Sequence, residues 1–152
     1  MDLLGDVLFT TEMVLIGAVI ALILSVATSI LFLQQGWGQI RKAVVEDDNA
    51  AYGILTGAVF VAVCALVGVA NRQSITPVWD PTLAERLSFT IGWVLYGQVL
   101  SFILCYFFNW LLFGLTPAAV RRELQEDHNP SVAAVCGLIY VGVSMLVVFR
   151  IL

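Results

Sequence analysis

Hydrophobic residues in this chain are gathered into four long runs that are separated by three shorter polar stretches. The runs cover about residues 7–33, 50–70, 87–115 and 131–152. Apolar runs of about 18 residues or more are typical of transmembrane helices, because about 20 helical residues span the hydrocarbon core of a bilayer. The pattern therefore predicts an all-α integral membrane protein with four transmembrane helices embedded in the lipid bilayer.

The polar stretches contain a nonapeptide that occurs twice. Residues 41–49 read RKAVVEDDN and residues 121–129 read RRELQEDHN, 80 positions apart. Gly17 and Gly97 match at the same offset. Matches of glycine and charged residues are more informative than matches of apolar residues, which recur by chance in membrane helices. The chain is therefore predicted to be a tandem duplication of a two-helix unit.

The two repeats are predicted to occupy residues 1–72 and 81–152, and the connecting loop over residues 71–86 contains their junction. Each repeat has two spans, an even number, so both copies enter the membrane in the same direction. Parallel repeats of this kind are related by a pseudo-two-fold axis along the membrane normal. Both nonapeptides are then expected on the same side of the membrane.

Basic residues indicate which side this is, because cytoplasmic loops carry an excess of Lys and Arg. The nonapeptides hold four of them and the opposite side holds three. The first set is Arg41, Lys42, Arg121 and Arg122, and the second is Arg72, Arg86 and Arg150. The counts predict cytoplasmic nonapeptides with both termini outside. The acidic start of the chain, which contains no Lys or Arg, agrees with this and favours a retained helix over a signal peptide.

Composition excludes several classes of protein. The chain is 61% hydrophobic and only 12% charged, whereas soluble domains carry about a quarter charged residues. It has no basic stripe that would bind nucleic acid. Cys64, Cys105 and Cys136 all lie in apolar runs, so they are interpreted as small packed residues. Glu12 is placed near the outer headgroups, either as a solvated residue or as a vestibule carboxylate that attracts cations.

The nonapeptide has a structural interpretation. Asn49 and Asn129 stand just before an apolar helix, where an N-cap residue accepts a hydrogen bond from the first turn. Pro130 then takes the first helical position, where no N–H is needed. The acidic residues before each Asn face the positive end of the helix dipole.

The alternative interpretation is a site for a cation or for a soluble cytoplasmic partner, formed by both copies on one face. Its carboxylates and imidazole are suitable cation ligands, but no metal-specific spacing is present, so no metal or cofactor is predicted. The candidate residues are Arg41, Lys42, Glu46, Asp47, Asp48, Asn49, Arg121, Arg122, Glu126, Asp127, His128 and Asn129.

Inside the third run, polar residues recur on one helical face. Gln98, Ser101, Cys105 and Asn109 have this spacing. The equivalent positions of the first run include Ser25 and Ser29, and the rest of that stripe is Ala18 and Ala21. Buried amides in a membrane need a partner or a wet cavity. The face is interpreted as inter-helix hydrogen bonding, also between protomers, or as the lining of a polar path.

Glycines are the predicted helix-packing positions, because small residues let membrane helices approach closely. Gly53 and Gly57 are four residues apart, and Gly57 matches Gly137 at the repeat offset. The packing set is Gly17, Gly53, Gly57, Gly97 and Gly137. These small-residue faces predict a homo-oligomer.

Enzyme chemistry is not expected. His128 is the only histidine and lies in a loop, and the chain contains neither a Ser-His-Asp grouping nor a phosphate-binding glycine loop. No charged residue is placed at mid-membrane, which argues against a proton-coupled pump.

The doubled motif resembles the bacterial inner-membrane family called domain of unknown function 350. The residues that carry the resemblance are 46–51, EDDNAA, and 126–131, EDHNPS, and the likeness covers essentially the whole chain. His128 and Pro130 depart from the family's more usual residues, which puts a symmetric use of the two motifs in doubt. The resemblance implies four spans from two tandem copies, an inner-membrane location and an envelope role beside membrane-stress or membrane-remodelling proteins, with no established activity.

Two functions follow as hypotheses. The first is a non-enzymatic scaffold that oligomerises and docks a partner at the nonapeptides. The second is a small ion channel or transporter lined by the polar face of the third helix, which would need several protomers because four helices enclose little space.

Overall fold

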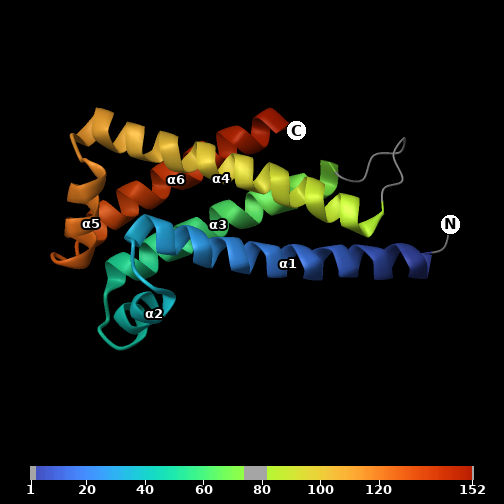
Figure 1. Ribbon diagram of the computed structural model, residues 1–152, viewed down its shortest axis with the longest axis horizontal. Coiled ribbons are helices and arrows are strands. Elements are labelled where there is room, and N and C mark those ends of the chain that lie inside the picture. Colours follow the sequence, from blue (N-terminus) through green and yellow to red (C-terminus); the bar gives the residue numbers. More distant parts are fainter. Residues whose placement is uncertain (1–2, 74–81, 152) are drawn as a thin grey trace.

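The computed structural model describes residues 3–73 and 82–151, with side chains from residue 11 to 72 and from 82 to 149. Six helices make up these residues (Figure 1). They are α1 (Leu3–Leu33), α2 (Trp37–Val45), α3 (Ala50–Gln73), α4 (Leu83–Phe113), α5 (Pro117–Gln125) and α6 (Pro130–Ile151). The all-helical fold that was predicted from the apolar runs is confirmed in the described residues.

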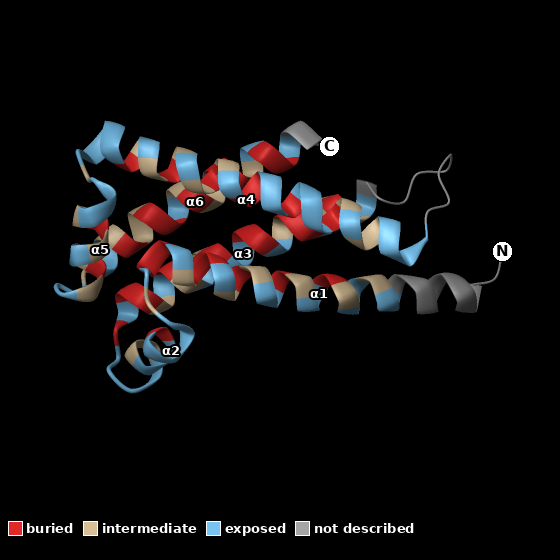
Figure 2. Cartoon of the chain, in the orientation of Figure 1, coloured by how far each residue is buried: buried red, intermediate tan, exposed pale blue. Residues whose placement is uncertain are grey.

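Four of the helices are long and apolar enough to cross a membrane. These candidate spans are Thr11–Leu33, Ala50–Arg72, Leu83–Phe113 and Pro130–Phe149. The chain is thus a membrane protein with four transmembrane helices. Many apolar residues of α1 and α4 are exposed, as they are when the solvent is lipid (Figure 2).

The helix bounds differ from the expected spans by one to four residues at several ends. The third span was predicted to begin near Leu87, but α4 begins at Leu83. Thr82 and Glu85 form a capping box: the Glu85 N–H donates to Thr82 Oγ1 at 3.4 Å, and the Thr82 N–H donates to Glu85 Oε2 at 2.8 Å. The connecting loop is therefore shorter than residues 71–86. Its tryptophan and prolines, at positions 77–81, lie outside the described residues.

The second correction concerns the two stretches that carry the nonapeptides, which were read as loops. Each contains a nine-residue amphipathic helix, α2 or α5. α2 buries Ile40, and α5 buries Val120 and Leu124 against the bundle. Both short helices lie at one end of the long helices, and α1 begins at the other end (Figure 1). We call this end, with residues 34–52 and 114–132, the motif end.

α3 and α6 form the centre of the bundle. α1 packs against α3, and α4 packs against both α6 and α3. α1 also meets α4 and α6 near the motif end, where Phe32 stacks on Tyr106 at 5.2 Å between ring centroids and contacts Tyr140 edge-on at 5.6 Å. These aromatic contacts close the bundle at that end.

Glycines allow the closest helix contacts. A Cβ built at Gly137 would lie 2.8 Å from the Ala58 Cβ, so α6 and α3 cross at this point. Gly97 meets the Leu66 side chain, and Gly17 meets the side chain of Asn71, in the same way. Gly57 differs, because nothing lies within 4 Å of a Cβ placed there.

Candidate functional site

Both nonapeptides lie at the motif end, where α2 and α5 carry their basic residues and the following turns carry most of their acidic residues. Most of these charged side chains are exposed. The exposed members are Arg41, Lys42, Glu46, Asp47, Asp48, Arg122, Glu126, Asp127 and His128. Arg121 and Asn129 are half-buried, and Asn49 is buried. The motif end therefore presents charges of both signs to the surroundings.

Asn49 and Asn129 cap the long helices that follow them. The Tyr52 N–H donates to Asn49 Oδ1 at 3.3 Å, and the Val132 N–H donates to Asn129 Oδ1 at 3.3 Å. The N-cap role predicted for both residues is confirmed. Ahead of each cap, Asp48 and His128 adopt left-handed backbone, with φ of 49° and 50°. Asp and His tolerate this conformation better than most residues.

The two caps differ in what their amide nitrogens bind. Asn49 Nδ2 donates across the molecule to the Leu124 carbonyl in α5, at 3.2 Å. Asn129 Nδ2 donates to Glu123 Oε2, at 2.9 Å, within its own motif. Only the first motif is thus tied to the other repeat through its asparagine.

A second polar contact joins the repeats in the same place. Gln125 Nε2 donates to the Leu33 carbonyl at 2.5 Å, at the end of α1. Beside it, the Tyr52 hydroxyl donates to Gln35 Oε1 at 2.8 Å. Sequence reasoning did not identify Gln35, Tyr52 or Gln125. Gln35 and Tyr52 lie at the edges of apolar runs, and Gln125 lies inside the second nonapeptide, where nothing distinguishes it from its polar neighbours.

These contacts surround a polar cavity of about 240 Å³, which we call the motif-end cavity. Its walls come from α2, α3 and α5 and from the turns next to them. The residues that line it are Gln35, Gln39, Lys42, Ala43, Asp47, Asn49, Tyr52, Gln125 and His128. The cavity therefore brings together four of the twelve candidate site residues, which are Lys42, Asp47 and Asn49 of the first nonapeptide and His128 of the second.

The remaining candidates do not line this cavity. Residues 46, 48, 126 and 127 are exposed at its margins or elsewhere on the motif end. Within the part of the chain that the structure describes, no three His, Cys, Asp or Glu residues are grouped closely enough to hold a metal ion. The two acidic clusters thus do not form one carboxylate cage there.

The polar face predicted on the third span lies inside the bundle. Gln98, Ser101, Cys105 and Asn109 are at most 6% exposed. Ser25 and Ser29 of α1 are buried as well, and Ser25 Oγ donates to the Ala21 carbonyl of its own helix at 2.6 Å.

Gln98 connects three helices at the midpoint of α4. Its Oε1 accepts hydrogen bonds from Thr28 Oγ1 of α1, at 2.9 Å, and from the Tyr140 hydroxyl of α6. Its Nε2 is buried and has no hydrogen-bond partner among the described residues. Sequence reasoning found Gln98 but not Thr28 or Tyr140, because both look like ordinary residues of an apolar helix.

The other polar residues of this face are paired. Ser144 Oγ of α6 donates to Ser101 Oγ at 3.0 Å. Asn109 Nδ2 donates to the Cys105 carbonyl at 2.8 Å, and Cys136 Sγ of α6 donates to Asn109 Oδ1 at 3.3 Å. Two of these hydrogen bonds join α4 to α6, and the bond from Asn109 to Cys105 lies within α4.

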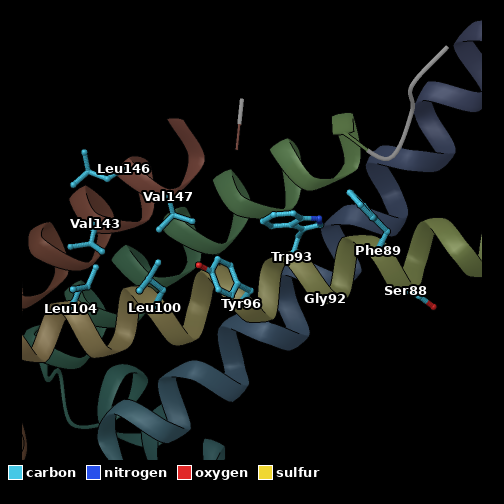
Figure 3. Close-up of a pocket in the computed structure, with 10 residues that line it drawn as sticks. All are labelled: Ser88, Phe89, Gly92, Trp93, Tyr96, Leu100, Leu104, Val143, Leu146 and Val147. Atoms are coloured by element: carbon cyan, nitrogen blue, oxygen red, sulfur yellow. The ribbon is translucent and has the colours of Figure 1, made fainter. Parts of the chain in front are cut away.

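A larger hollow of about 880 Å³ lies between α4 and α6 (Figure 3). Trp93, Tyr96, Leu100 and Val147 are among its lining residues, and Gly92 leaves room beside them. Its walls are predominantly apolar and belong to two membrane-spanning helices, so lipid chains are suitable neighbours for it.

Comparison with known proteins yields one match. A family model described as Domain of Unknown Function (DUF350) matches residues 6–150. No curated protein and no solved structure matches the chain.

Proposed function

The chain belongs to the family of the Domain of Unknown Function (DUF350), and on this premise we propose that it is a non-enzymatic membrane scaffold that docks a soluble partner at the motif end. Two hydrogen bonds at the motif end carry the proposal. The bond from Asn49 to Leu124 joins the two nonapeptides, and the bond from Gln125 to Leu33 joins the second nonapeptide to the end of α1. Helices held in this way offer a preorganised surface, and preorganisation lowers the entropy lost on binding.

The exposed charges support a protein partner. α2 and α5 present Arg41, Lys42 and Arg122, and the turns after them present Glu46 and Glu126. Charges of both signs at the rim of an interface steer association and select the partner. With the nonapeptides cytoplasmic and both termini outside a bacterial inner membrane, as the distribution of Lys and Arg predicts, the partner is cytoplasmic.

Assembly into a homo-oligomer is the second part of the proposal. Gly57 is exposed on α3 and has open space around it, whereas Gly17, Gly97 and Gly137 are filled by neighbouring side chains of the same chain. An open glycine on a membrane helix lets the backbone of another helix approach. A helix of a second copy is the occupant that we propose for this face.

The docking proposal is tested by photo-crosslinking in cells. A photoreactive residue replaces Glu46 or Glu126, and a matched control replaces Leu138, which is 73% exposed on the membrane span α6. We expect both motif positions, but not position 138, to give an adduct with the same soluble protein. We also expect Asp47→Lys together with Asp127→Lys to abolish the adduct at normal membrane levels of the protein. Crosslinks to lipid or to a second copy alone would contradict the proposal.

A channel or transporter is the competing function, and one observation favours it. Gln98 Nε2 lacks a partner in the described structure, at the middle of a membrane-spanning helix and next to a column of polar side chains. A polar path of this kind would use several protomers or a rearranged bundle, because the side chains of the column pack against one another.

Ion flux into liposomes separates the two functions. The test compares the wild type with Gln98→Leu/Asn109→Leu and with Val99→Leu/Trp110→Leu, whose wild-type side chains are exposed on the same helix. Flux that is lost only in the first variant, at unchanged oligomer size, supports a channel. The channel hypothesis is contradicted if correctly inserted wild-type protein conducts no common ion.

A further inference from the structure

The motif-end cavity lies at the depth of lipid headgroups. Gln35 follows the last residue of α1 by two positions, and Tyr52 is the third residue of α3. The ends of membrane-spanning helices coincide with the boundary between hydrocarbon and water, where headgroups lie. The exposed Trp37, the first residue of α2, fits the same boundary.

The cavity has a closed floor and an open rim. Asn49 and Tyr52, on the floor, are 4% and 2% exposed. Gln39, Lys42, Asp47 and His128, on the rim, are exposed. A ligand therefore enters from the headgroup side and meets charged groups first.

The uncharged polar side chains of the cavity already take part in hydrogen bonds within the chain. Asn49 uses its oxygen for the Tyr52 N–H and its nitrogen for the Leu124 carbonyl. The Tyr52 hydroxyl donates to Gln35 Oε1, and Gln39 Oε1 accepts from the Gly36 N–H at 3.2 Å. The oxygens of both glutamines are thus engaged, which leaves their N–H groups as donors for a ligand.

The groups available to a ligand are of two kinds. The Lys42 ammonium, the His128 imidazole and the amide N–H groups of Gln35 and Gln39 suit an anion. The Asp47 carboxylate, from the same wall as Lys42, suits a cation. A ligand that carries a phosphate and an ammonium a few bonds apart satisfies both kinds, and a simple anion or a metal ion satisfies only one.

The volume of the cavity limits the size of this ligand. At about 240 Å³ it is smaller than the 300–1,000 Å³ or so of sites that enclose drug-sized molecules. It holds a headgroup but neither a peptide segment nor a folded domain. The partner proposed to dock at the motif end would contact the rim and not fill the cavity.

We propose that the motif-end cavity binds a phosphoethanolamine group, with the phosphate held by Lys42, His128 and the glutamine amides and the ammonium held by Asp47. The group is either the headgroup of a phospholipid or free phosphoethanolamine. This inference goes beyond partner docking and does not depend on it, because the ligand would occupy the cavity whether or not a partner contacts the rim.

The test measures lipid binding to the purified full-length protein by native mass spectrometry. The probes are phosphatidylethanolamine, phosphatidylcholine and phosphatidylglycerol with identical acyl chains. The wild type is expected to prefer the ethanolamine lipid about tenfold, because a charge-assisted hydrogen bond to a primary ammonium is worth about this factor. A quaternary choline has no N–H with which to make that bond.

Matched variants separate the cavity from general charge effects. Asp47→Asn is expected to abolish the preference for ethanolamine over choline, whereas Asp48→Asn, next to it and outside the cavity, keeps it. Lys42→Ala is expected to weaken binding of all three phospholipids about tenfold, and Arg41→Ala is expected to leave it unchanged. Unchanged oligomer size and melting temperature show that each variant is folded.

Competition with free phosphoethanolamine identifies the source of the group. Displacement of bound lipid supports the lipid headgroup. Binding of the free compound that depends on Asp47 and Lys42, without any lipid preference, supports the soluble source. Equal binding of all three lipids together with no binding of the free compound overturns the proposal, as does an equal effect of Asp47→Asn and Asp48→Asn. A missing soluble partner in the crosslinking experiment leaves this result unaffected.

Discussion

Gln98 shows how one amide can organise a membrane bundle. Two hydroxyls, from Thr28 and Tyr140, donate to its oxygen, and its nitrogen is left without a partner in the described structure. A hydroxyl can donate to the amide oxygen or accept from the amide nitrogen. Whichever of these two atoms of Gln98 faces the hydroxyls, the other atom has no partner among the described residues. The net stabilisation from this node is therefore modest, although it connects α1, α4 and α6.

Removing the Tyr140 hydroxyl tests this node. Tyr140→Phe keeps the ring contact with Phe32 and leaves the Thr28 bond to Gln98 intact. We expect it to lower the free energy of unfolding by about 0.6 kcal/mol, the average for hydrogen bonds between membrane helices, and by no more than about 1.7 kcal/mol, the largest value found. The measurement is reversible unfolding of the purified protein in detergent or bilayers.

Tyr106→Phe is the matched control. Its hydroxyl donates to the Phe32 carbonyl at 3.5 Å, which is a long and therefore weak hydrogen bond. Its ring also stacks on Phe32. We expect a smaller loss than for Tyr140→Phe. Equal losses would show that the hydrogen bond from Tyr140 to Gln98 contributes no more stability than the weak bond made by Tyr106.

Gly137 and Gly57 form a second matched pair, 80 positions apart. Gly137→Ala places a methyl group 2.8 Å from the Ala58 Cβ, which cannot rotate away. The backbones of α3 and α6 must then separate, and we expect a loss of about 1–3 kcal/mol in the free energy of unfolding. Gly57→Ala, with open space around it, should not lower that value in the monomer, because alanine favours a helix interior over glycine by about 0.5–1 kcal/mol.

A compensating substitution makes this prediction sharper. Ala58→Gly removes the methyl group that the one introduced at position 137 would meet, so the double variant is expected to regain most of the lost stability. A cycle of the four proteins measures the coupling. Independent effects of the two substitutions would argue against a direct contact between these positions.

At the level of elements, the long helices were predicted well and the short ones were not. A run of more than 20 apolar residues has few competing interpretations in a sequence. α2 and α5 have nine residues each and bury one and two side chains, respectively, so their periodic signal is weak. For α5, Thr116 followed by Pro117 is a sequence signal for the start of a helix. The structure agrees with it, because the Ala119 N–H donates to Thr116 Oγ1 at 3.2 Å.

The candidate site was predicted in part for a similar reason. The capping role of Asn49 follows from its place before an apolar run, which is local information. The bond from its nitrogen to Leu124 joins residues 75 positions apart, and no local pattern specifies it. Gln35 and Gln125 belong to the site because the fold places α5 beside the end of α1, which the sequence does not specify locally.

The unequal bonds of the two asparagines give an element-level prediction. Asn129→Ala removes a helix cap and should lower the free energy of unfolding by about 1 kcal/mol. Asn49→Ala removes a cap and also the bond to α5, so we expect a loss of about 2 kcal/mol. Hydrogen exchange of the α5 amides should rise in Asn49→Ala.

Asn49→Asp separates the two contributions of Asn49. Aspartate keeps the cap acceptor but cannot donate to the Leu124 carbonyl, so its stability should fall between those of the wild type and Asn49→Ala. If α5 exchanged at the wild-type rate in both variants, the cross-repeat bond would have no role in holding that helix.

For the molecule as a whole, the tandem duplication and its pseudo-two-fold axis stay predictions from the sequence, and the two halves of the chain share several features that a duplication would produce. α1 and α4 have 31 residues each, α2 and α5 have nine each, and Asp48 and His128 share a left-handed backbone. The interiors nevertheless differ, because Asn49 crosses to the other repeat and Gly57 is open where Gly137 is packed.

The membrane orientation predicted from the basic residues can be measured. Single cysteines at positions 46 and 126, in a background without Cys64, Cys105 and Cys136, should react with a membrane-impermeant thiol reagent only from the cytoplasmic side. A cysteine at position 85, near the start of α4, should react only from the outside. Labelling of 46 and 126 from opposite sides would disprove a parallel repeat.

The bond from Asn49 to α5 also has a consequence for how the chain is made. A ribosome delivers the first repeat to the membrane before residues 124 and 125 have been synthesised. During that interval Asn49 Nδ2 and the Leu33 carbonyl lack the partners that they have in the finished fold. The first repeat is thus inserted with an incomplete end, and translation of the second repeat completes it.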